Sequence, residues 1–421
     1  MISTAHRSAV VRELSPQAPA AAGHPVSLRS DATVTEYLQP IRHLLDDAGV
    51  NELCINRPGE VFVERAGAWE RLQVPALGSR HCQSLATAIA TLTGQHTSEQ
   101  NPLLSAALST GERVQVVQPS ATPADQIALC IRRPSARVRR LEDFAAQGLF
   151  GRVQATRHTL APFEEELLAL KAQGRYVEFF RLAVQSHQTM VVAGKTGSGK
   201  TTFMKGLVEE VSVTERLITI EDAAELTWPN HPNKLHLFYS KGGQGASAVS
   251  AKLLLEACLR LRPDRIFLAE MRGEEAFYFL RLAASGHPGS VTSVHAGSCE
   301  LAFEQIALMV RESAGGAGMT MPEINRLARS VIDVVVHFGV DASGRFISGI
   351  HYDPQAPAGG KRHERHRCGA GCGFSPCTAV CPGWFIAHGK TGADRAGRGR
   401  LPWRNRSGDA VWQRRPVHAV P

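Results

Sequence analysis

The stretch "HQTMVVAGKTGSGKTTFMKGLVEEV", residues 187–211, carries the strongest pattern in the chain. Within it, residues 194–201 match G-x-x-x-x-G-K-[ST] at every fixed position. An apolar run as long as a strand precedes these residues, and a segment with helical periodicity follows them. A glycine-rich loop between a strand and a helix is the setting in which this motif holds phosphate, so we predict a phosphate-binding loop here.

The residue types of this loop suit a nucleoside triphosphate. Gly194, Gly197 and Gly199 let the backbone turn tightly with its N–H groups pointing inward. Those donors and the positive end of the following helix attract phosphate oxygens. We therefore expect the Lys200 ammonium to reach the β- and γ-phosphates and the Thr201 hydroxyl to ligate Mg²⁺.

The sequence around the loop predicts an α/β domain over residues 160–353. Strand-like apolar runs alternate there with helical segments, which is typical of a mostly parallel sheet covered by helices on both faces. Residues 31–137 mix helices and strands without strict alternation, so we predict a smaller α+β domain, joined by a linker over 138–159. In that first domain, residues 35–47 have helical periodicity and Gly94 is placed to end a second helix.

The two ends differ from the body of the chain in composition. Residues 1–30 are rich in Ala, Pro and Ser and are predicted to be disordered. Residues 354–421 carry 12 Lys and Arg against 3 Asp and Glu, a net charge of +9, so the other 353 residues sum to −1 within the total of +8. The near-neutral charge of the body argues against a nucleic-acid partner for it.

The cysteines divide the chain in the same way. Five lie in the body and are expected to be buried reduced thiols: Cys54, Cys82, Cys130, Cys258 and Cys299. The tail holds the other four, without the C-x2-C pairs of common zinc modules: Cys368, Cys372, Cys377 and Cys381. Three interpretations of this basic Cys-, Gly- and Pro-rich tail stay open: a zinc site, a disordered tail that contacts membrane or nucleic acid, and a non-native segment such as a shifted reading frame.

The bulk composition is that of a globular protein. Apolar residues make up 43% of the chain and charged residues 20%. No apolar run approaches the roughly 18–20 residues that span a bilayer, and the N-terminus lacks the apolar core of a secretory signal. We expect a cytosolic protein without a transmembrane segment, able to contact a membrane surface.

Acidic residues follow two of the strand-like runs. The stretch "RIFLAEMRG", residues 265–273, places Glu270 at the end of an apolar strand, where ligands bind in parallel sheets. Glu270 can serve Mg²⁺ through water or position the attacking water; the alternative is a surface residue at a strand end. Glu221 and Asp222 follow another strand, where they can bind Mg²⁺, orient water or lie in a solvated turn.

Two histidines bracket a short strand in "SGHPGSVTSVHA", residues 285–296. The eight-residue separation of His287 and His295 is not the i, i+3 or i, i+4 spacing of metal ligands on a helix. Gly286 and Pro288 fix a tight turn before the strand. Either at least one of the histidines senses a phosphate or positions water, or both hold the turn by hydrogen bonds.

The stretch "RPDRIFLAEMRGEEAFYFLRLAASGHPGSVTSVHA", residues 262–296, resembles the hexameric traffic ATPases of type IV secretion and conjugation systems, which belong to the type II and type IV secretion ATPase superfamily of P-loop proteins. The resemblance covers about residues 35–353 and keeps the family order of motifs. It implies a RecA-like motor domain, ATP and Mg²⁺ as cofactors, and a homohexameric ring with nucleotide between the two domains of a subunit. The turn "GHPGS" favours the conjugation-type branch over the tight-adherence pilus branch.

The resemblance also implies roles for matched residues. Phosphate binding falls to Gly194, Lys195, Thr196, Gly197, Ser198, Gly199, Lys200, Thr201 and Thr202. Glu270 becomes the Walker B acid, Glu221 with Asp222 the acidic box, and His287 with His295 the histidine box. Arg113 and either Arg132 or Arg133 reach the nucleotide from the first domain, where an arginine can neutralise charge on the γ-phosphate.

The expected function is therefore an ATP-hydrolysing hexameric motor at the cytoplasmic face of the inner membrane. It energises substrate export or pilus assembly by a type IV secretion system, together with other inner-membrane and cytoplasmic components of that system. Three alternatives remain open: a pilus-type or type II secretion ATPase, a nucleic-acid motor such as a helicase or packaging ATPase, and a scaffold that uses ATP only to assemble.

Overall fold

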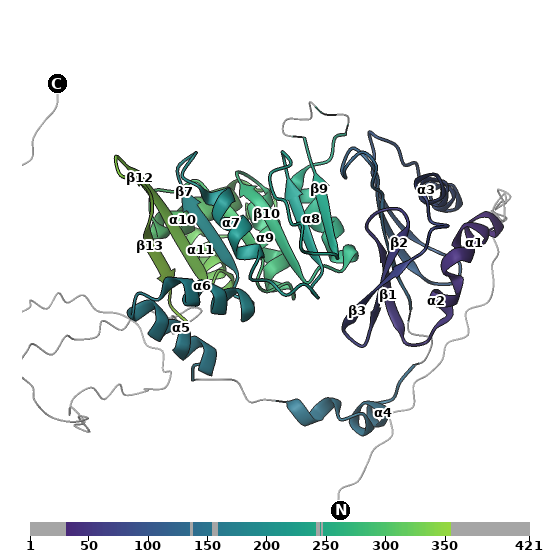
Figure 1. Cartoon of the computed structure of the whole chain (residues 1–421), viewed down its shortest axis with the longest axis horizontal. Helices are drawn as coiled ribbons and strands as arrows, with labels where there is room; N and C mark the ends of the chain where they lie inside the picture. Colours follow the sequence, from purple (N-terminus) through teal and green to yellow (C-terminus); the bar gives the residue numbers. More distant parts are fainter. Residues whose placement is uncertain (1–30, 135–137, 154–158, 241–244, 246, 355–421) are drawn as a thin grey trace, which may run out of the picture. The chain divides into compact units, whose positions relative to one another are not determined.

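Two β-sheets organise the residues that the computed structural model describes, which are 31–134, 138–153, 159–240, 245 and 247–354 (Figure 1). All of these residues belong to one compact unit, Met1–Lys361. The predictions made for residues 1–30 and for the cysteine-containing tail after residue 354 fall outside the described residues. The predicted limits of the two domains, at residues 137 and 160, stay a prediction.

The first sheet is antiparallel throughout. Its six strands lie in the order β3-β2-β1-β6-β5-β4. The strands are β1 Val50–Ile55, β2 Glu60–Arg65, β3 Ala68–Gln73, β4 Leu103–Ala107, β5 Arg113–Val117 and β6 Ala128–Arg132. Helices that precede and interrupt the strands cover one face, because the inward side chains of β1, β2, β5 and β6 share a hydrophobic core with them. The helices are α1 Ala32–Leu38, η1 Gln39–Ile41, α2 Arg42–Asp46 and α3 Ser79–Thr93.

Local sequence explains where these helices end. The helical stretch predicted over residues 35–47 forms, but it narrows to the 3₁₀ turn η1 at Pro40, where proline removes a main-chain donor. Helix α3 ends at Gly94, whose φ of 69° is in the left-handed region, as predicted for a glycine in that position. The turn chemistry of the first domain is therefore readable from its Pro and Gly residues.

The second sheet is parallel except at one edge. Its seven strands lie in the order β13-β12-β7-β11-β10-β8-β9, and only β12 and β13 run antiparallel. The strands are β7 Met190–Gly194, β8 Leu217–Glu221, β9 Lys234–Phe238, β10 Arg265–Met271, β11 Val291–Val294, β12 Val334–Asp341 and β13 Gly344–Tyr352. The central strands are buried along most of their length, which agrees with the mostly parallel sheet predicted from their apolar runs.

Helices cover both faces of this sheet (Figure 1). One face packs against α5 Pro162–Ala172, α6 Tyr176–Gln185 and α7 Lys200–Val208. The other packs against α8 Ala251–Leu261, α9 Glu275–Ala284, α10 Cys299–Glu312 and α11 Met321–Val331. None of the described helices has both the length and the hydrophobicity needed to cross a bilayer.

The region predicted as a linker contains short helical segments. They are α4 Leu141–Ala146 and the 3₁₀ turn η2 Leu149–Arg152. Their apolar side chains are exposed: Leu141 is 71% exposed and Leu149 62%. Such exposure means that this segment gains little stability from burial of apolar surface.

A buried arginine joins the two sheets. The Arg216 guanidinium is fully buried and donates hydrogen bonds to the Leu261 carbonyl and to Oδ1 of both Asn56 and Asn233. Asn56 follows β1 and Asn233 precedes β9. A buried guanidinium needs such acceptors because losing its hydration is costly. The contact ties the end of β1 to the second sheet.

A half-buried carboxyl just before β12 makes stability depend on pH. Burial raises the pKa of Asp333 from 3.8 to about 6, although its Oδ2 accepts a hydrogen bond from the Thr189 main chain. Because the folded pKa lies above the unfolded one, the stabilising contribution is complete below about pH 4 and is lost as pH rises through about 6. We predict that between about pH 4.5 and 7.5 the wild type loses about 2 kcal/mol more unfolding free energy than the Asp333→Asn variant, measured by urea titration. Parallel pH profiles for the two proteins would contradict this account.

Candidate functional site

The phosphate-binding loop, residues 194–202, connects β7 to the N-terminus of α7. Gly194 is tightly packed: a Cβ there would lie 2.8 Å from the Ser198 hydroxyl oxygen and 2.9 Å from the Phe338 carbonyl oxygen. Gly199 caps α7 with a φ of 98°, a conformation that side chains other than glycine rarely adopt. Both glycines of the fixed pattern are thus required by the backbone, and the N-terminus of a helix faces the loop.

Two polar side chains of the loop are buried without a polar side-chain partner. The Ser198 hydroxyl is fully buried and has no hydrogen-bond partner. Lys200 is 7% exposed. Its ammonium donates only to the main-chain carbonyls of Gly194 and Lys195 in the same loop, each at 3.1 Å. Burial lowers the pKa of Lys200, while the charge of Glu270 raises it. A phosphate group would supply the acceptors that these groups lack, so the loop fits the triphosphate that the sequence predicts.

A row of side chains crosses the same edge of the sheet. The Arg272 guanidinium donates to Oε2 of Glu270 at 2.5 Å and to Oδ2 of Asp222 at 2.7 Å. On the other side, Nε2 of His295 lies 2.6 Å from Oε1 of Glu270. These residues follow or end β8, β10 and β11, and the loop follows β7, the next strand. The sheet therefore brings the sequence-predicted Glu270, Asp222 and His295 into one row beside the loop.

Glu221 belongs to the core beneath this row. Its side chain is fully buried, and Oε2 accepts the main-chain N–H groups of Glu225 and Leu226 at 2.9 and 2.7 Å. Burial pushes the pKa of Glu221 up, but hydrogen bonds from His236 and from these N–H groups outweigh it, so the pKa is lowered on balance. The carboxylate thus holds the turn after β8 together.

The two histidines lie at opposite edges of the sheet. His295 follows the C-terminal end of β11, whereas His287 precedes the start of that strand. The His287 ring contacts the Leu282 carbonyl at 3.3 Å, and burial lowers its pKa. His287 therefore fits the alternative in which a histidine holds the turn, and His295 fits the role at the phosphate. Across the described part of the chain, no group of three or more His, Cys, Asp or Glu side chains could hold a metal ion.

Known proteins share this loop and sheet. The family model described as "Type II/IV secretion system protein" matches residues 152–337. The type IV secretion system protein VirB11 of Brucella suis is 51% identical over 333 residues, which are 78% of this chain and 92% of that protein. The chain belongs to the VirB11 family of type IV secretion ATPases. PtlH of Bordetella pertussis, another type IV secretion system protein, is 39% identical over 311 residues, which are 72% of this chain and 90% of PtlH.

A solved structure supports the VirB11 assignment in three dimensions. The crystal structure of the VirB11 ATPase from the Brucella suis type IV secretion system, in complex with sulphate, matches with a TM-score of 0.73 and 51% identity. The match covers 77% of this chain and 98% of that one. The resemblance inferred from the motifs is therefore confirmed, and so is the expected ATPase class.

The arginines expected to reach the nucleotide lie together on the first sheet. Arg113 begins β5 and is paired with Arg132 at the end of β6. The Arg133 guanidinium donates to the Asp47 carbonyl at 2.8 Å. Within the described residues, none of the three forms a hydrogen bond or ion pair with the phosphate-binding loop. Their roles in this VirB11-family chain therefore stay a prediction.

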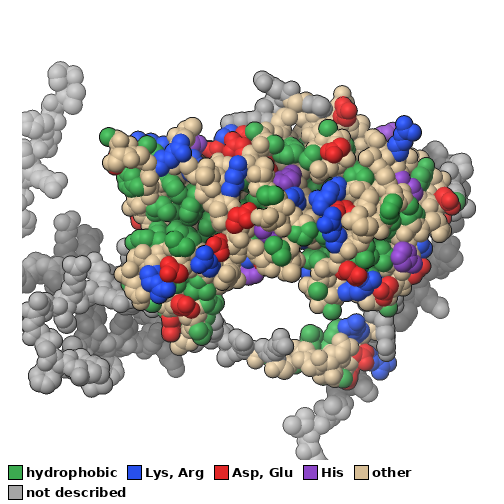
Figure 2. All heavy atoms as spheres, in the orientation of Figure 1, with side chains coloured by type: hydrophobic (Ala, Val, Ile, Leu, Met, Phe, Trp, Pro, Cys, Tyr) green, Lys and Arg blue, Asp and Glu red, His purple; other side chains and the backbone are tan. Residues whose placement is uncertain are grey.

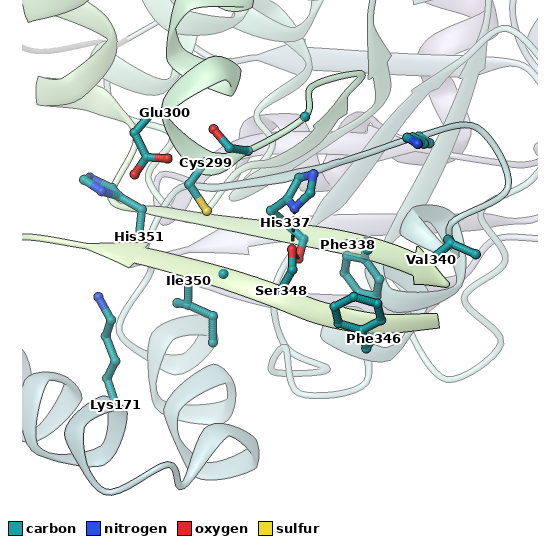
Figure 3. A pocket seen from close by; sticks show the side chains of 15 residues that line it. Lys171, Cys299, Glu300, His337, Phe338, Val340, Phe346, Ser348, Ile350 and His351 are labelled. Atoms are coloured by element: carbon teal, nitrogen blue, oxygen red, sulfur yellow. Dashed lines mark hydrogen bonds between the residues drawn. The ribbon is translucent and has the colours of Figure 1, made fainter. Parts of the chain in front are cut away.

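A cavity of about 670 Å³ adjoins the loop on its other side. It lies between the β12–β13 hairpin and the start of α10, and Phe338 and Phe346 are among the residues that line it (Figure 3). The described residues that line it include Lys195 of the loop but neither Lys200 nor Glu270. The row of side chains formed by Asp222, Arg272, Glu270 and His295 therefore lies outside this cavity, and the phosphate-binding loop lies at its border.

The surface of the body agrees with its near-neutral charge. On the face drawn in Figure 2, Lys and Arg side chains are interspersed with Asp and Glu side chains over both sheets. Hydrophobic side chains gather over the β12–β13 hairpin, where Val340 and Phe346 are about half exposed, at 51% and 45%. No single basic field suited to a nucleic acid covers this face.

Sequence reasoning missed two arginines of this site. Arg272 lies two residues after Glu270, just past the end of β10, and this proximity in the sequence was the available signal. Arg345 of β13 approaches the loop from the other side: its Cδ would lie 3.4 Å from a Cβ at Gly199. No local pattern marks Arg345, because 146 residues separate it from Gly199 in the sequence.

Substitutions of Glu221 test whether this residue stabilises the turn after β8 or takes part in ATP hydrolysis. Glu221→Ala leaves two buried N–H groups without an acceptor, so we predict a loss of about 2–4 kcal/mol in unfolding free energy, whereas Glu221→Gln keeps an acceptor oxygen and loses less than about 1.5 kcal/mol. Urea titration followed by circular dichroism measures both. The Gln variant is also expected to retain hydrolysis within about threefold. A stable Gln variant with a turnover as low as a Glu270 variant would instead place Glu221 in the chemistry.

Proposed function

We propose that this VirB11-family chain binds the phosphates of ATP with residues 194–202 and hydrolyses the terminal phosphate at the edge where β7, β10 and β11 end. The observation that supports it most is that a loop with unused hydrogen-bond donors lies near a carboxylate on a neighbouring part of the sheet. Ser198 and Lys200 supply unmet donors in the loop, and Glu270 ends β10, two strands from β7. Donors and a carboxylate in that arrangement are what in-line attack of water on phosphorus requires.

The residues divide the reaction between them. Main-chain N–H groups of the loop and the Lys200 ammonium neutralise charge that develops on the phosphate oxygens. Glu270 orients the attacking water, and His295, which contacts Glu270, is placed to sense the γ-phosphate or to help position that water. Glu221 supports the turn that carries Asp222 and does not itself contact the water. His287 is left out of the reaction, because it precedes β11 at the far edge.

The site also suits Mg²⁺ bound together with the nucleotide. Thr201 in the first turn of α7 and Glu270, through water, would hold the ion. Oxygen donors of these types match the preference of Mg²⁺, which keeps several waters and usually binds with substrate phosphates. When bound, it would neutralise negative charge on the β- and γ-phosphates.

Arginines of the first sheet would complete the site. We infer that Arg113, with Arg132 or Arg133, approaches the nucleotide when the domains close, within one subunit or from a neighbouring one. The placement of Arg113 and Arg132 as directly opposed residues of β5 and β6 supports this, because cross-strand partners carry their side chains on the same face of the sheet. Closing and reopening around ATP would convert turnover into motion.

The family resemblance supports a proposal for the assembly of the protein and its place in the cell. We propose that the second sheet is the core of a RecA-like motor domain, preceded by a smaller α+β domain, and that six subunits form a homohexameric ring. The ring would act at the cytoplasmic face of the inner membrane with other secretion components, energising export or pilus assembly. The support is the 51% identity to the Brucella suis VirB11 protein over most of both chains.

Replacing Lys200 tests the hydrolytic site directly. We predict that Lys200→Ala lowers kcat more than about 100-fold, because one ammonium neutralises much of the phosphate charge. The melting temperature is expected to change by less than about 3 °C, since the Lys200 bonds are confined to the loop. Lys205→Ala, on the same helix, is the matched control and should hydrolyse ATP within twofold of the wild type. Hydrolysis at the wild-type rate in the Lys200 variant would refute the site.

The ring can be tested independently of the chemistry. We predict that light scattering with ATP and Mg²⁺ gives the mass of six copies for both the full chain and a chain ending at Asp353. The same number of copies and equal turnover are expected for the two proteins, because the resemblance ends near residue 353 and the match to the family model ends at residue 337. A chain that hydrolyses ATP at full rate as a monomer would contradict the ring and leave the site intact.

A further inference from the structure

Two carboxylates beside the phosphate-binding loop hold an arginine to which neither the motifs nor the relatives assign a role. Arg272 follows β10 and lies between carboxylates from neighbouring strand ends. Its Nη2 donates to Glu270 at 2.5 Å and its Nη1 to Asp222 at 2.7 Å. On the other side of the Glu270 carboxylate, Nε2 of His295 lies 2.6 Å from Oε1, but that oxygen accepts no hydrogen bond, so among the described residues Arg272 supplies the hydrogen bond that holds this carboxylate.

Glu270 depends on such contacts because the sheet does not fix its direction. The pairing of β10 with β8 ends at Leu268, and the register between β10 and β11 shifts between Leu268 and Met271. Glu270 therefore lies in an irregular stretch, where the alternation of a regular strand no longer sets the side-chain direction. A glutamate also has three rotatable side-chain bonds. Without outside contacts its carboxylate would sample several positions.

Arg272 is itself anchored at both ends. The main-chain N–H groups of Arg272 and Gly273 both donate to Oε1 of Glu275, at 2.6 and 2.9 Å, which fixes the backbone at the start of α9. At the other end, Asp222 holds the guanidinium. A planar guanidinium donates in fixed directions, so it transmits this anchoring to Glu270 better than a flexible ammonium would.

The partial exposure of these groups indicates that their contacts orient the Glu270 carboxylate more than they stabilise the fold. The Arg272 side chain is 37% exposed and Asp222 25%, whereas Glu270 is 13% exposed. Partly exposed ion pairs contribute little to folding because water and salt screen them. The same contacts can still decide the direction of one carboxylate, and a misplacement of about 1 Å in a reacting group can lower a rate about 100-fold.

We propose that Arg272 is a positioning residue for ATP hydrolysis: it aims the Glu270 carboxylate at the attacking water, and Asp222 anchors it without binding the metal. The inference rests on the proposed hydrolysis at residues 194–202. Arg272 acts through Glu270 and does not contact the nucleotide, because both ends of its guanidinium are already engaged by carboxylates.

A double-mutant cycle tests this role. Single-turnover hydrolysis and the Kd for a fluorescent ATP analogue are measured for the wild type, Arg272→Ala, Arg272→Lys, Glu270→Gln and the combined Arg272→Ala/Glu270→Gln protein. Arg272→Ala is expected to slow hydrolysis at least tenfold with Kd within threefold. Arg272→Lys should recover part of the rate, because an ammonium can still contact one carboxylate. In the Glu270→Gln background, removing Arg272 should change the rate less than twofold.

Two further variants keep the test interpretable. Arg181→Ala removes an arginine whose side chain is bonded to Glu210 and to no described residue of the site, and should hydrolyse ATP like the wild type. If Arg272→Ala fails to fold, Asp222→Asn loosens the anchor and leaves the arginine in place. It should slow hydrolysis about three- to tenfold, again with no further effect beside Glu270→Gln.

Distinct results would overturn the proposal. A further tenfold loss in the Glu270→Gln background would show that Arg272 contacts the phosphate directly. A Kd raised more than tenfold would make it a nucleotide-binding residue, and an unchanged rate would leave it without a role. Failure of the proposed function has its own signature: equal hydrolysis by the wild type and Lys200→Ala, whatever Arg272 does.

Discussion

The parallel order of four neighbouring strands is the constraint on which the site depends. Because β7, β11, β10 and β8 run in the same direction, their C-terminal ends meet at one edge of the sheet. The phosphate-binding loop leaves the first of these strands, and His295, Glu270 and Asp222 end or follow the others. Residues that are about 100 positions apart in the chain thereby become neighbours, and the same direction sends His287 to the opposite edge.

Charge at this edge is balanced across the row. The cationic groups Arg272 and Lys200 alternate with the carboxylates Asp222 and Glu270, so no carboxylate is left beside another without a cation between them. Beneath the row, Glu221 is satisfied by main-chain N–H groups and His236. The Glu221 carboxylate is thus hydrogen-bonded at both oxygens, while the loop keeps donors for a ligand. This contrast separates the support of the site from its chemistry.

Much of this arrangement follows from local sequence. The loop, the strand that ends at Glu270 and the helix that ends at Gly94 each carry a pattern that acts over a few residues. Three strands were not predicted: β3 Ala68–Gln73, β4 Leu103–Ala107 and β9 Lys234–Phe238. Strand β3 is largely exposed, β4 has a single fully buried residue, and β9 has half-buried charged and polar residues between apolar ones. The partners of Arg272 and Arg345 depend on contacts between distant segments. The strand between His287 and His295 was predicted from the sequence, and β11 confirms it.

The most direct test of the account is a crystal structure of the full chain with Mg²⁺ and ADP–beryllium fluoride, which mimics the γ-phosphate. We expect the beryllium fluoride group to bind the main-chain amides of residues 194–202 and the Lys200 ammonium. The Glu270 carboxylate should lie about 3 Å from a water placed in line with it, with Arg272 still between Glu270 and Asp222. A fluoride group bound in that loop with Glu270 turned away, and no carboxylate near the in-line water, would contradict the central claim.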